Sequence, residues 1–289
     1  MRMTNFTRYQ RQMIFPGLGE TGQAQLAAAT AVVVGCGATG TALSNQLARA
    51  GVGKLRIIDR DFIELNNLQR QILFDEDDIA ASLPKAEAAA RKLRAVNREI
   101  EIEAVVADVN PGNVVGLIED ATVVLDGTDN FSTRYLLNDA CVKLSKPWVY
   151  TGVIASYGMT ATFLPADAAA TLPGDRTETG CLRCLLGEMP APGTAATCDT
   201  AGVIGPAVAM ITAISAAEAM KLIVGQGELN TGLIHMDVWT HEYELFGGGG
   251  RRPECPTCGA HVYEFLDATV GATSSSLCGR NAVQVSVHG

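Results

Sequence analysis

Two Cys-x-x-Cys pairs carry the most specific chemistry in this chain. Cys181 and Cys184 stand in TGCLRCLLGE, and Cys255 and Cys258 stand in PECPTCGA. Four thiolates in two such pairs suit a tetrahedral structural zinc site. A redox pair would more typically open a helix in a thioredoxin-like setting, which neither copy has. The sequence therefore predicts one Zn²⁺ site assembled from two distant segments, with a redox pair or unconnected buried cysteines as the alternatives.

A glycine-rich turn follows a β-branched apolar run in AVVVGCGATG. Its Gly-x-Gly-x-x-Gly spacing is formed by Gly35, Gly37 and Gly40, and the next apolar run ends at Asp59. Such glycines permit a tight turn and a close approach of phosphates to the backbone, and a carboxylate at this spacing can accept hydrogen bonds from ribose hydroxyls. We expect a nucleotide site here; the alternative is a merely structural turn.

Polar side chains crowd the stretch just after that second apolar run. They are Asn66, Asn67, Gln69, Arg70 and Gln71, followed by Lys85. Ligands of α/β folds bind beyond the carboxyl ends of the strands, and this many polar groups there favours a nucleoside triphosphate over a dinucleotide. The alternative is that Asn67 and Arg70 cap a helix or pair on the surface.

The elements that must position these residues alternate along the chain. Strand-like IEIEAVVAD is followed by helical NPGNVVGLIED. Strand-like ATVVLDGTDN is then followed by helical FSTRYLLNDACVKLS. This alternation implies a parallel sheet covered on both faces. We expect a Rossmann-like, doubly wound α/β fold with a mostly parallel sheet, an antiparallel C-terminal part and a structural zinc knuckle.

The sequence pattern also divides the chain into two parts. Residues 1–246 are expected to form the main domain, with a long, mobile crossover loop at about 165–204. Residues 247–289 are expected to hold a glycine-rich joint, the second half of the zinc site and a C-terminal extension.

Composition limits the partners. Asp plus Glu (31) exceed Lys plus Arg (22), and the net charge of -9 disfavours a general nucleic-acid binder.

The N-terminal MRMTNFTRYQRQMIF has polar residues where a signal peptide has its apolar run, so we expect a cytoplasmic protein. The apolar stretch 201–217 contains glycines and a proline and predicts a buried core helix, with a membrane span as the remote alternative.

Two further motifs point to a known family. RYQRQ at residues 8–12 and DGTDN at residues 126–130, together with the motifs above, resemble signatures of the ThiF, MoeB and HesA family over roughly residues 5–262. Members adenylate the C-terminal glycine of ubiquitin-like sulfur-carrier proteins and are relatives of the ubiquitin-activating enzymes. The resemblance implies ATP, Mg²⁺ and structural Zn²⁺, a homodimer, a Gly-Gly carrier partner and a separate sulfur donor, a cysteine desulfurase or a rhodanese.

The resemblance also assigns roles to residues. Asp59 is expected to bind the ribose, Asp129 to hold Mg²⁺, and Arg11 to reach across a homodimer into the partner's site. The implied nucleotide-binding residues are Gly35, Gly37, Ala38, Gly40, Asp59, Asn66, Asn67, Leu68, Gln69, Arg70, Lys85, Asp129 and Asn130. The implied catalytic residues are Arg11, Arg70, Lys85, Asp129 and Cys198.

The expected chemistry needs no general base. A glycine carboxylate, with an ordinary pKa of about 3.5, is already ionised at neutral pH. Cationic side chains and Mg²⁺ must instead offset its repulsion from an anionic phosphate. The four histidines all lie in the last quarter of the chain and are expected to be structural or surface residues.

Cys198, in AATCDTAGVIGP, matches a position where some family members carry a cysteine that bonds to the activated carrier or its sulfur; the alternative is a bystander. The tail ATSSSLCGRNAVQVSVHG, with Cys278, resembles an extension of some ThiF-type proteins and favours the thiamine pathway over molybdenum cofactor synthesis or tRNA thiolation. Two other function classes stay open: a nicotinamide-dependent oxidoreductase, and a zinc-stabilised scaffold for a ubiquitin-like partner.

Overall fold

Strands and helices alternate along the first half of the chain, as predicted. The structure is a computed structural model, and it describes residues 6–191, 193–194, 198–247, 250–267, 274–277 and 282–285. Its strands are β1 (Thr30–Val34), β2 (Lys54–Ile58), β3 (Glu101–Val105), β4 (Val123–Asp126), β5 (Trp148–Ile154), β6 (Tyr157–Phe163), β7 (Leu233–Asp237), β8 (Glu242–Phe246), β9 (Ser274–Leu277) and β10 (Ala282–Val285). Its α-helices are α1 (Gln10–Met13), α2 (Gly19–Ala28), α3 (Ala38–Ala50), α4 (Glu76–Ala80), α5 (Lys85–Val96), α6 (Val114–Ile118), α7 (Phe131–Lys143), α8 (Ala166–Thr171), α9 (Leu182–Leu186), α10 (Cys198–Ala201) and α11 (Gly205–Val224).

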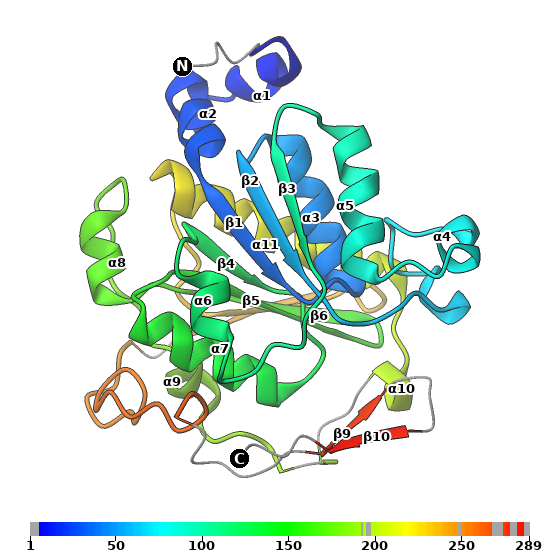
Figure 1. The fold of residues 1–289 in the computed structure, drawn as a ribbon. Coiled ribbons are helices and arrows are strands. Elements are labelled where there is room, and N and C mark those ends of the chain that lie inside the picture. Colours follow the sequence, from blue (N-terminus) through cyan, green and yellow to red (C-terminus); the bar gives the residue numbers. More distant parts are fainter. Residues whose placement is uncertain are drawn as a thin grey trace.

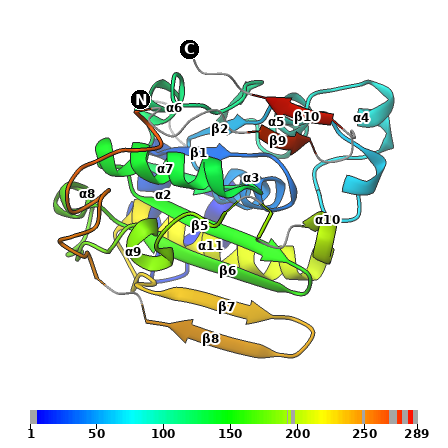
Figure 2. The same cartoon turned by 90° about the horizontal axis from the view of Figure 1, so that it is seen from below.

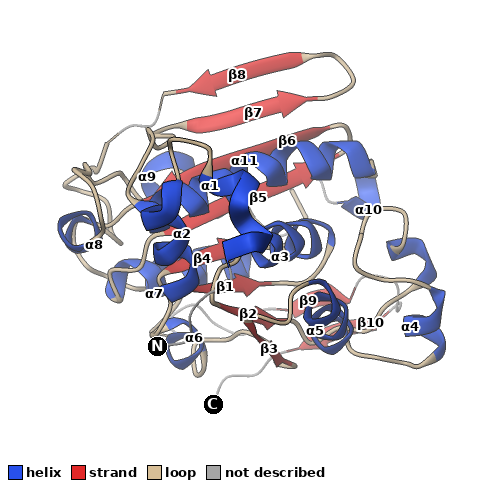
Figure 3. Ribbon diagram, turned by 90° about the horizontal axis from the view of Figure 1, so that it is seen from above, coloured by secondary structure: helices blue, strands red, loops and turns tan. Residues whose placement is uncertain are grey.

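The main sheet has eight strands in the order β3-β2-β1-β4-β5-β6-β7-β8. Neighbouring strands from β3 to β5 are parallel, and those from β5 to β8 are antiparallel, with β7 and β8 at the edge (Figure 3). This confirms the expected mixed sheet. Helical crossovers make the parallel half, whereas short turns such as the one between β5 and β6 can join only antiparallel strands.

The register of the parallel strands places the candidate residues together. Val34, the last residue of β1, lies opposite Ile58 at the end of β2 and opposite Asp126 at the end of β4. The glycine turn after β1, Asp59 after β2 and the 126–130 turn after β4 therefore share one edge of the sheet, where α/β folds bind their ligands.

Two apolar cores cover the two faces of the sheet. On one face α2, α3, α5 and α11 bury side chains such as Leu43, Leu93 and Leu222. On the other face α6, α7 and α9 do so, with Ile118, Leu137 and Leu182 fully buried. Figure 1 shows α1 and α2 at the top of the view and α10 at the opposite end of the sheet. The doubly wound arrangement is confirmed.

Helix α11 is long and apolar enough to span a membrane by length and composition alone. In the fold it is a core helix. Its Ser215 Oγ donates to Thr160 Oγ1 on β6 over 2.9 Å and accepts from Thr151 Oγ1 on β5 over 2.9 Å. The carboxylate of Glu218, 3% exposed, accepts from Thr162 Oγ1 over 2.8 Å. These buried bonds fix α11 across β5 and β6, as the core-helix prediction requires.

The segment between β6 and α11, predicted to be irregular over 165–204, contains the short helices α8, α9 and α10 (Figure 2). After β8, the segment with the second cysteine pair folds back onto α7 and α9. The antiparallel pair β9–β10 forms a separate two-stranded sheet. Cys278 lies outside the described residues. The division of the chain at residue 246 stays a prediction.

Candidate active site

The glycine turn owes its three glycines to different neighbours. Gly35 has φ +90°, and a Cβ placed on it would lie 2.5 Å from the carbonyl oxygen of Gly127. A Cβ on Gly40 would overlap the carbonyl oxygen of Gly35. Gly37, by contrast, faces open space: among the described residues a Cβ there would meet only the Nε2 atom of Gln71, 3.9 Å away. The first and third glycines therefore serve packing, and the second leaves room for a ligand at the N-terminus of α3.

Asp59 is held at the end of β2 by two backbone donors. Its Oδ2 accepts from the N–H of Cys36 over 2.6 Å, and its Oδ1 accepts from the N–H of Asp61 over 2.7 Å. Burial raises the pKa of Asp59, although the positive charge of Lys85 and the two backbone hydrogen bonds act in the opposite direction. The carboxylate is thus oriented beside the glycine turn, where a ribose-binding acid is expected.

Lys85 is a buried cation whose charge acts on Asp59. It begins α5, is 8% exposed, and its Nζ lies 3.6 Å from Asp61 Oδ2. Its backbone N–H donates to the carbonyl of Asp61 over 2.8 Å. An ammonium group in this place can attract an anionic ligand, as predicted for the triphosphate.

Some polar side chains of the segment 66–71 form hydrogen bonds within the segment or to its neighbours. Asn67 is 7% exposed, accepts from the N–H of Glu64 over 3.1 Å and donates to Asn66 Oδ1 over 2.7 Å. Arg70 donates from Nη1 to the carbonyl of Asn66 over 2.7 Å. Asn67 and Arg70 thus make the local contacts named as their alternative, while the guanidinium of Arg70 keeps further donors for a ligand. Leu68 is half-buried between them.

The 126–130 turn is locked by an ion pair that sequence inspection missed. Asp126, fully buried, accepts from Arg134 Nε over 2.9 Å and from the N–H and Oγ1 of Thr128 over 2.8 and 2.6 Å. Arg134 also donates to the carbonyls of Thr128 and Thr151, over 2.7 and 3.3 Å. No local pattern in the sequence marks this pair. The pair fixes the backbone that carries Asp129.

Asp129 and Asn130 differ in whether their side-chain oxygens are available to a ligand. Asp129 is exposed at the edge of the sheet formed by the carboxyl ends of the strands. Asn130 is the N-cap of α7, and its Oδ1 accepts from the N–H of Thr133 over 2.8 Å. Asp129 therefore offers carboxylate oxygens to a cation, whereas the side-chain oxygen of Asn130 already has a structural partner.

Arg11 lies far from these groups within one chain. Helix α1 packs on the distal ends of α3 and α5, where Gln12 donates to the carbonyl of Ala50 and Tyr9 accepts from Asn97. The glycine turn lies at the other end of α3, which spans roughly 20 Å at 1.5 Å per residue. Arg11, itself exposed, is therefore not brought into this chain's own site.

Cys198 begins α10, and its side chain lies outside what the structure describes. The backbone just after α10 is tied to the site. Val203 accepts from Gln69 Nε2 over 3.3 Å, and Ala155 bonds through its backbone to Gly202 and Ile204 over 2.8 and 3.0 Å. The chain that carries Cys198 thus approaches the polar segment 66–71, the candidate nucleotide segment.

The four paired cysteines meet at one point. Their sulfur atoms all lie within 4.8 Å of one another, with Cys181 to Cys255 at 3.6 Å and Cys184 to Cys258 at 3.3 Å. Tetrahedral zinc with Zn–S bonds of about 2.3 Å places sulfur atoms about 3.8 Å apart, so the set fits this ion. Hydrogen bonds from the Cys181 and Cys258 thiols hold the pKa of Cys184 well below its ordinary value. The prediction of one joint cluster is confirmed.

Helix α7 anchors the cysteine cluster to the core. Asp139, fully buried, accepts from Thr257 Oγ1 over 3.0 Å and from the N–H of Phe265 over 2.9 Å. Asn138 Oδ1 accepts from the N–H of Leu182 over 2.9 Å.

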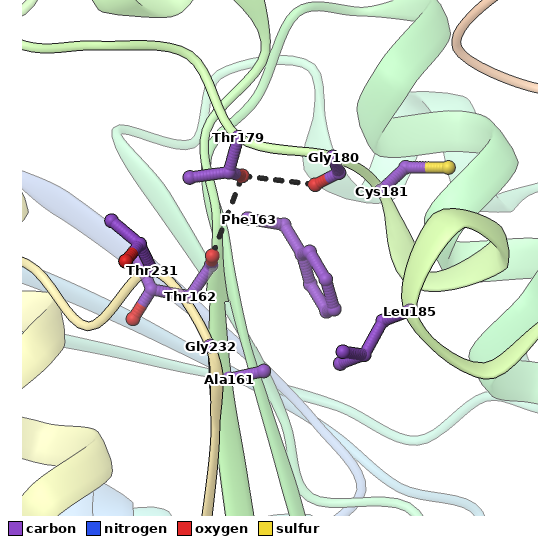
Figure 4. A pocket seen from close by; sticks show the side chains of 9 residues that line it. All are labelled: Ala161, Thr162, Phe163, Thr179, Gly180, Cys181, Leu185, Thr231 and Gly232. Atoms are coloured by element: carbon purple, nitrogen blue, oxygen red, sulfur yellow. Dashed lines mark hydrogen bonds between the residues drawn. The ribbon is translucent and has the colours of Figure 1, made fainter. Parts of the chain in front are cut away.

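A small cavity of about 10 Å³ lies beside Cys181, between Phe163 and Leu185 (Figure 4), and has room for no more than about one water molecule. It is not a ligand site.

Comparison with known proteins agrees with this geometry. Residues 9–257 match the ThiF family. The chain is 42% identical over 279 residues to the sulfur carrier protein ThiS adenylyltransferase of Bacillus subtilis, covering 96% of this chain and 79% of the relative. It is 37% identical over 257 residues to the SAMP-activating enzyme E1 of Haloferax volcanii, covering 89% and 90%.

A solved structure gives the same result for the fold. The crystal structure of E. coli MccB with ATP superposes with a TM-score of 0.73 at 25% identity, covering 88% of this chain and 75% of that one. The family match extends from just before α1 to residue 257, and so includes the glycine turn, the 126–130 turn and three of the four clustered cysteines. The chain belongs to the ThiF family.

Proposed function

We propose that this chain is an ATP-dependent adenylyltransferase that activates the C-terminal glycine carboxylate of a ubiquitin-like, ThiS-class sulfur carrier. The observation that carries the proposal is the 42% identity to a ThiS adenylyltransferase over 96% of the chain. The site geometry agrees, because the open glycine turn, Asp59, Lys85 and Asp129 lie at the same edge of the sheet, beyond the carboxyl ends of the parallel strands. The nicotinamide-dependent alternative has no support from the family.

The reaction joins two anions. A carboxylate oxygen of the carrier attacks the α-phosphorus of ATP, a new O–P bond forms, and the bond to pyrophosphate breaks with its electron pair leaving on pyrophosphate. The backbone N–H groups at the N-terminus of α3 can face the phosphates through the opening over Gly37. Arg70 and Lys85 supply positive charge beside them, which lowers the repulsion in the transition state.

Asp129 is the residue that would hold Mg²⁺. Its carboxylate is exposed at the strand edge, and hard oxygen ligands are what this cation prefers. When bound, Mg²⁺ supplies further neutralisation of phosphate charge. The Arg134–Asp126 pair keeps the Asp129 backbone in place, so the chain positions this carboxylate before a nucleotide arrives.

Arg11 would complete the site from a second copy of the chain. Helix α11 reaches the nucleotide segment at its start, where Gly205 lies against the carbonyl of Gln69, and packs on α2 at its end through Val224 and Gly22. A two-fold axis across the middle of two antiparallel α11 helices would therefore bring α1 of each copy toward the partner's nucleotide segment. Exposed small residues of α11, Ala209, Ala213 and Ala217, would permit this close approach.

Cys198 would act after adenylation. Its helix α10 directly precedes the backbone tied to Gln69 and Ala155, so the chain could present this sulfur near the activated carboxylate. Sulfur itself would come from a separate donor protein, a cysteine desulfurase or a rhodanese. A ThiS-class carrier assigns the chain to thiamine biosynthesis in the cytoplasm.

A second candidate carrier is the Gly-Gly protein of another sulfur pathway, such as the small subunit of molybdopterin synthase. The observation in its favour is the 37% identity to an enzyme named for a different carrier, SAMP. The chemistry is the same for both carriers, because each would present the carboxylate of a C-terminal Gly-Gly tail.

The test is pyrophosphate release from ATP and Mg²⁺ with each purified Gly-Gly carrier of the organism, followed by intact mass of the carrier. We expect a carrier adenylate with the ThiS-class protein and none with the same carrier lacking its last glycine. Asp129→Asn should lower the rate by at least about 100-fold, since it removes charge from the cation ligand. Wild-type protein that releases no pyrophosphate with any carrier, or that transfers hydride, would contradict the proposal.

A further inference from the structure

Helix α1 carries Arg11 but is too short to hold its own position. It spans four residues, none of them buried, and an isolated helix of fewer than about 12 residues is marginal in water. Arg11 is exposed, and Ile14 and Phe15, directly after α1, are 65% and 66% exposed. The place of Arg11 must therefore be set by contacts that its neighbours in sequence make with the rest of the chain.

Asn97 ties the residue before α1 to the end of α3. It follows α5, is fully buried, and its Nδ2 donates to the hydroxyl of Tyr9 over 2.8 Å and to the carbonyl of Ala48 over 2.7 Å. The ring of Tyr9, 3% exposed, lies against Gly51, where a Cβ would come within 2.5 Å of it. Tyr9 is thus fixed both by its ring and by its hydroxyl group.

Gln23 of α2 makes a second tie, to α1 itself. Its side chain is fully buried, its Oε1 accepts from Gln12 Nε2 over 2.8 Å, and its Nε2 donates to the carbonyl of Ala50 over 3.0 Å. Gln12 Nε2 also donates to the Ala50 carbonyl, over 2.9 Å. The last carbonyls of a helix have no intrahelical partner, so the two amides complete the end of α3 and also hold α1 there.

The two ties lie on either side of Arg11 in the sequence. Tyr9 and Gln12 bond inward to the core, and Arg11 between them is exposed. The side-chain hydrogen bonds that Asn97 and Gln23 make within the described chain all lie at the end of α3 farther from the glycine turn. Loss of either amide should therefore disturb α1 and leave the candidate nucleotide site of the same chain in place.

We propose that Asn97 and Gln23 are positioning residues for Arg11, which fix α1 on the end of α3 and so aim this arginine at the nucleotide site of a second copy of the chain. The inference rests on the proposed function, in which Arg11 acts across a homodimer, and adds two residues that act through it. A side chain carried on a fixed backbone loses less conformational entropy when it meets its ligand than one carried on a loose arm.

Asn97→Leu and Gln23→Met remove the amides at nearly constant side-chain size. Each should lower pyrophosphate release by about 10-fold or more, since a misplacement of about 1 Å can cost about 100-fold. Mixed with Asp129→Asn and allowed to exchange subunits, each should recover about one quarter of wild-type activity, because half the dimers are mixed and each holds one intact site. Mixed with Arg11→Ala, each should recover nothing beyond the activity of the separate variants, because both partners then lack a correctly placed arginine.

A merely structural role predicts the reverse pattern. If the substitutions damage the site of their own chain through α3, the mixture with Arg11→Ala recovers and the mixture with Asp129→Asn does not, and the inference is overturned. Activity that neither mixture recovers, while Arg11→Ala and Asp129→Asn complement each other, also overturns it. Tyr9→Phe removes only the hydroxyl that Asn97 bonds; it should show the same pattern in milder form, and it replaces Asn97→Leu if that variant does not fold.

The matched control is Gln46→Met on α3. Gln46 is half-buried and donates to Thr212 Oγ1 of α11 over 3.3 Å. This variant loses an amide from the same helix without touching α1, so it should keep the wild-type rate of pyrophosphate release. A loss as large as that of Gln23→Met would overturn the inference. Wild-type protein that releases no pyrophosphate with any carrier would instead contradict the proposed function itself.

Discussion

Replacement of Arg134 by Met should destabilise the chain and disable the turn that carries Asp129. Arg134 is 7% exposed and donates to three acceptors, the carboxylate of Asp126 and the carbonyls of Thr128 and Thr151. Removing one partner of a buried ion pair costs about 3–5 kcal/mol, because the other charge stays buried without compensation. Asp126 keeps its two bonds from Thr128, so we expect a loss near the lower end, about 3 kcal/mol.

Urea denaturation followed by circular dichroism measures this loss as a shift in the free energy of unfolding. Pyrophosphate release, measured where both proteins are folded, should fall by about 100-fold, the cost of misplacing a catalytic group by about 1 Å. The double variant Asp126→Asn with Arg134→Met should lose less stability than the sum of the single variants, since it leaves neither charge unpaired.

Arg56→Met is the matched control. Arg56 is 8% exposed, but its partners Glu103 and Asp120 have side chains exposed by 36% and 47% and can return to water. Its loss should cost about 1 kcal/mol and leave adenylation intact, as expected of pairs with exposed partners. A loss below about 1 kcal/mol in Arg134→Met, or a rate equal to that of the control, would refute the assigned role of the buried pair.

Two further outcomes are expected. Cys255→Ser should lower bound zinc, measured by plasma mass spectrometry, well below the wild-type content and reduce the thermal midpoint, whereas Cys141→Ser, outside the cluster, should keep the zinc; equal zinc in both variants would count against the four-cysteine site. Arg11→Ala and Asp129→Asn should each be inactive alone, yet a mixture allowed to exchange subunits should recover about one quarter of wild-type activity, because half the dimers are mixed and each holds one intact site. A mixture that stays inactive would show that Arg11 does not act across a dimer.

The sequence predicted those parts of the site that depend on local patterns. The glycine spacing and the alternation of apolar runs are short-range signals, and they placed Gly35 and Asp59 at the correct strand ends. The pairing of two distant cysteine motifs was also predictable, because two Cys-x-x-Cys pairs supply the four thiolates that a tetrahedral zinc site needs. The roles of the individual nucleotide residues stay predictions.

Long-range contacts were not predictable in the same way. The Arg134–Asp126 pair depends on how α7 packs against β4 and β5, and nothing in the spacing of the two residues marks it. The burial of Gln71 results from the fold of the 66–74 segment over the turn, which polar composition alone would place at the surface. Helices α8 and α9 are short, and their ends lack side-chain N-caps that would have identified them in the sequence.

Helix α7 links the segment after β8 to the 126–130 turn. It starts beside Asp129, and its buried Asp139 accepts from Thr257 Oγ1 and from the N–H of Phe265, both in the segment 250–267. Burial raises the pKa of Asp139 to about 6, and the hydrogen bonds from Phe265 and Thr257 act in the opposite direction. Loss of the contacts from residues 250–267 would therefore act on α7, and through this helix on the backbone of the 126–130 turn at its start.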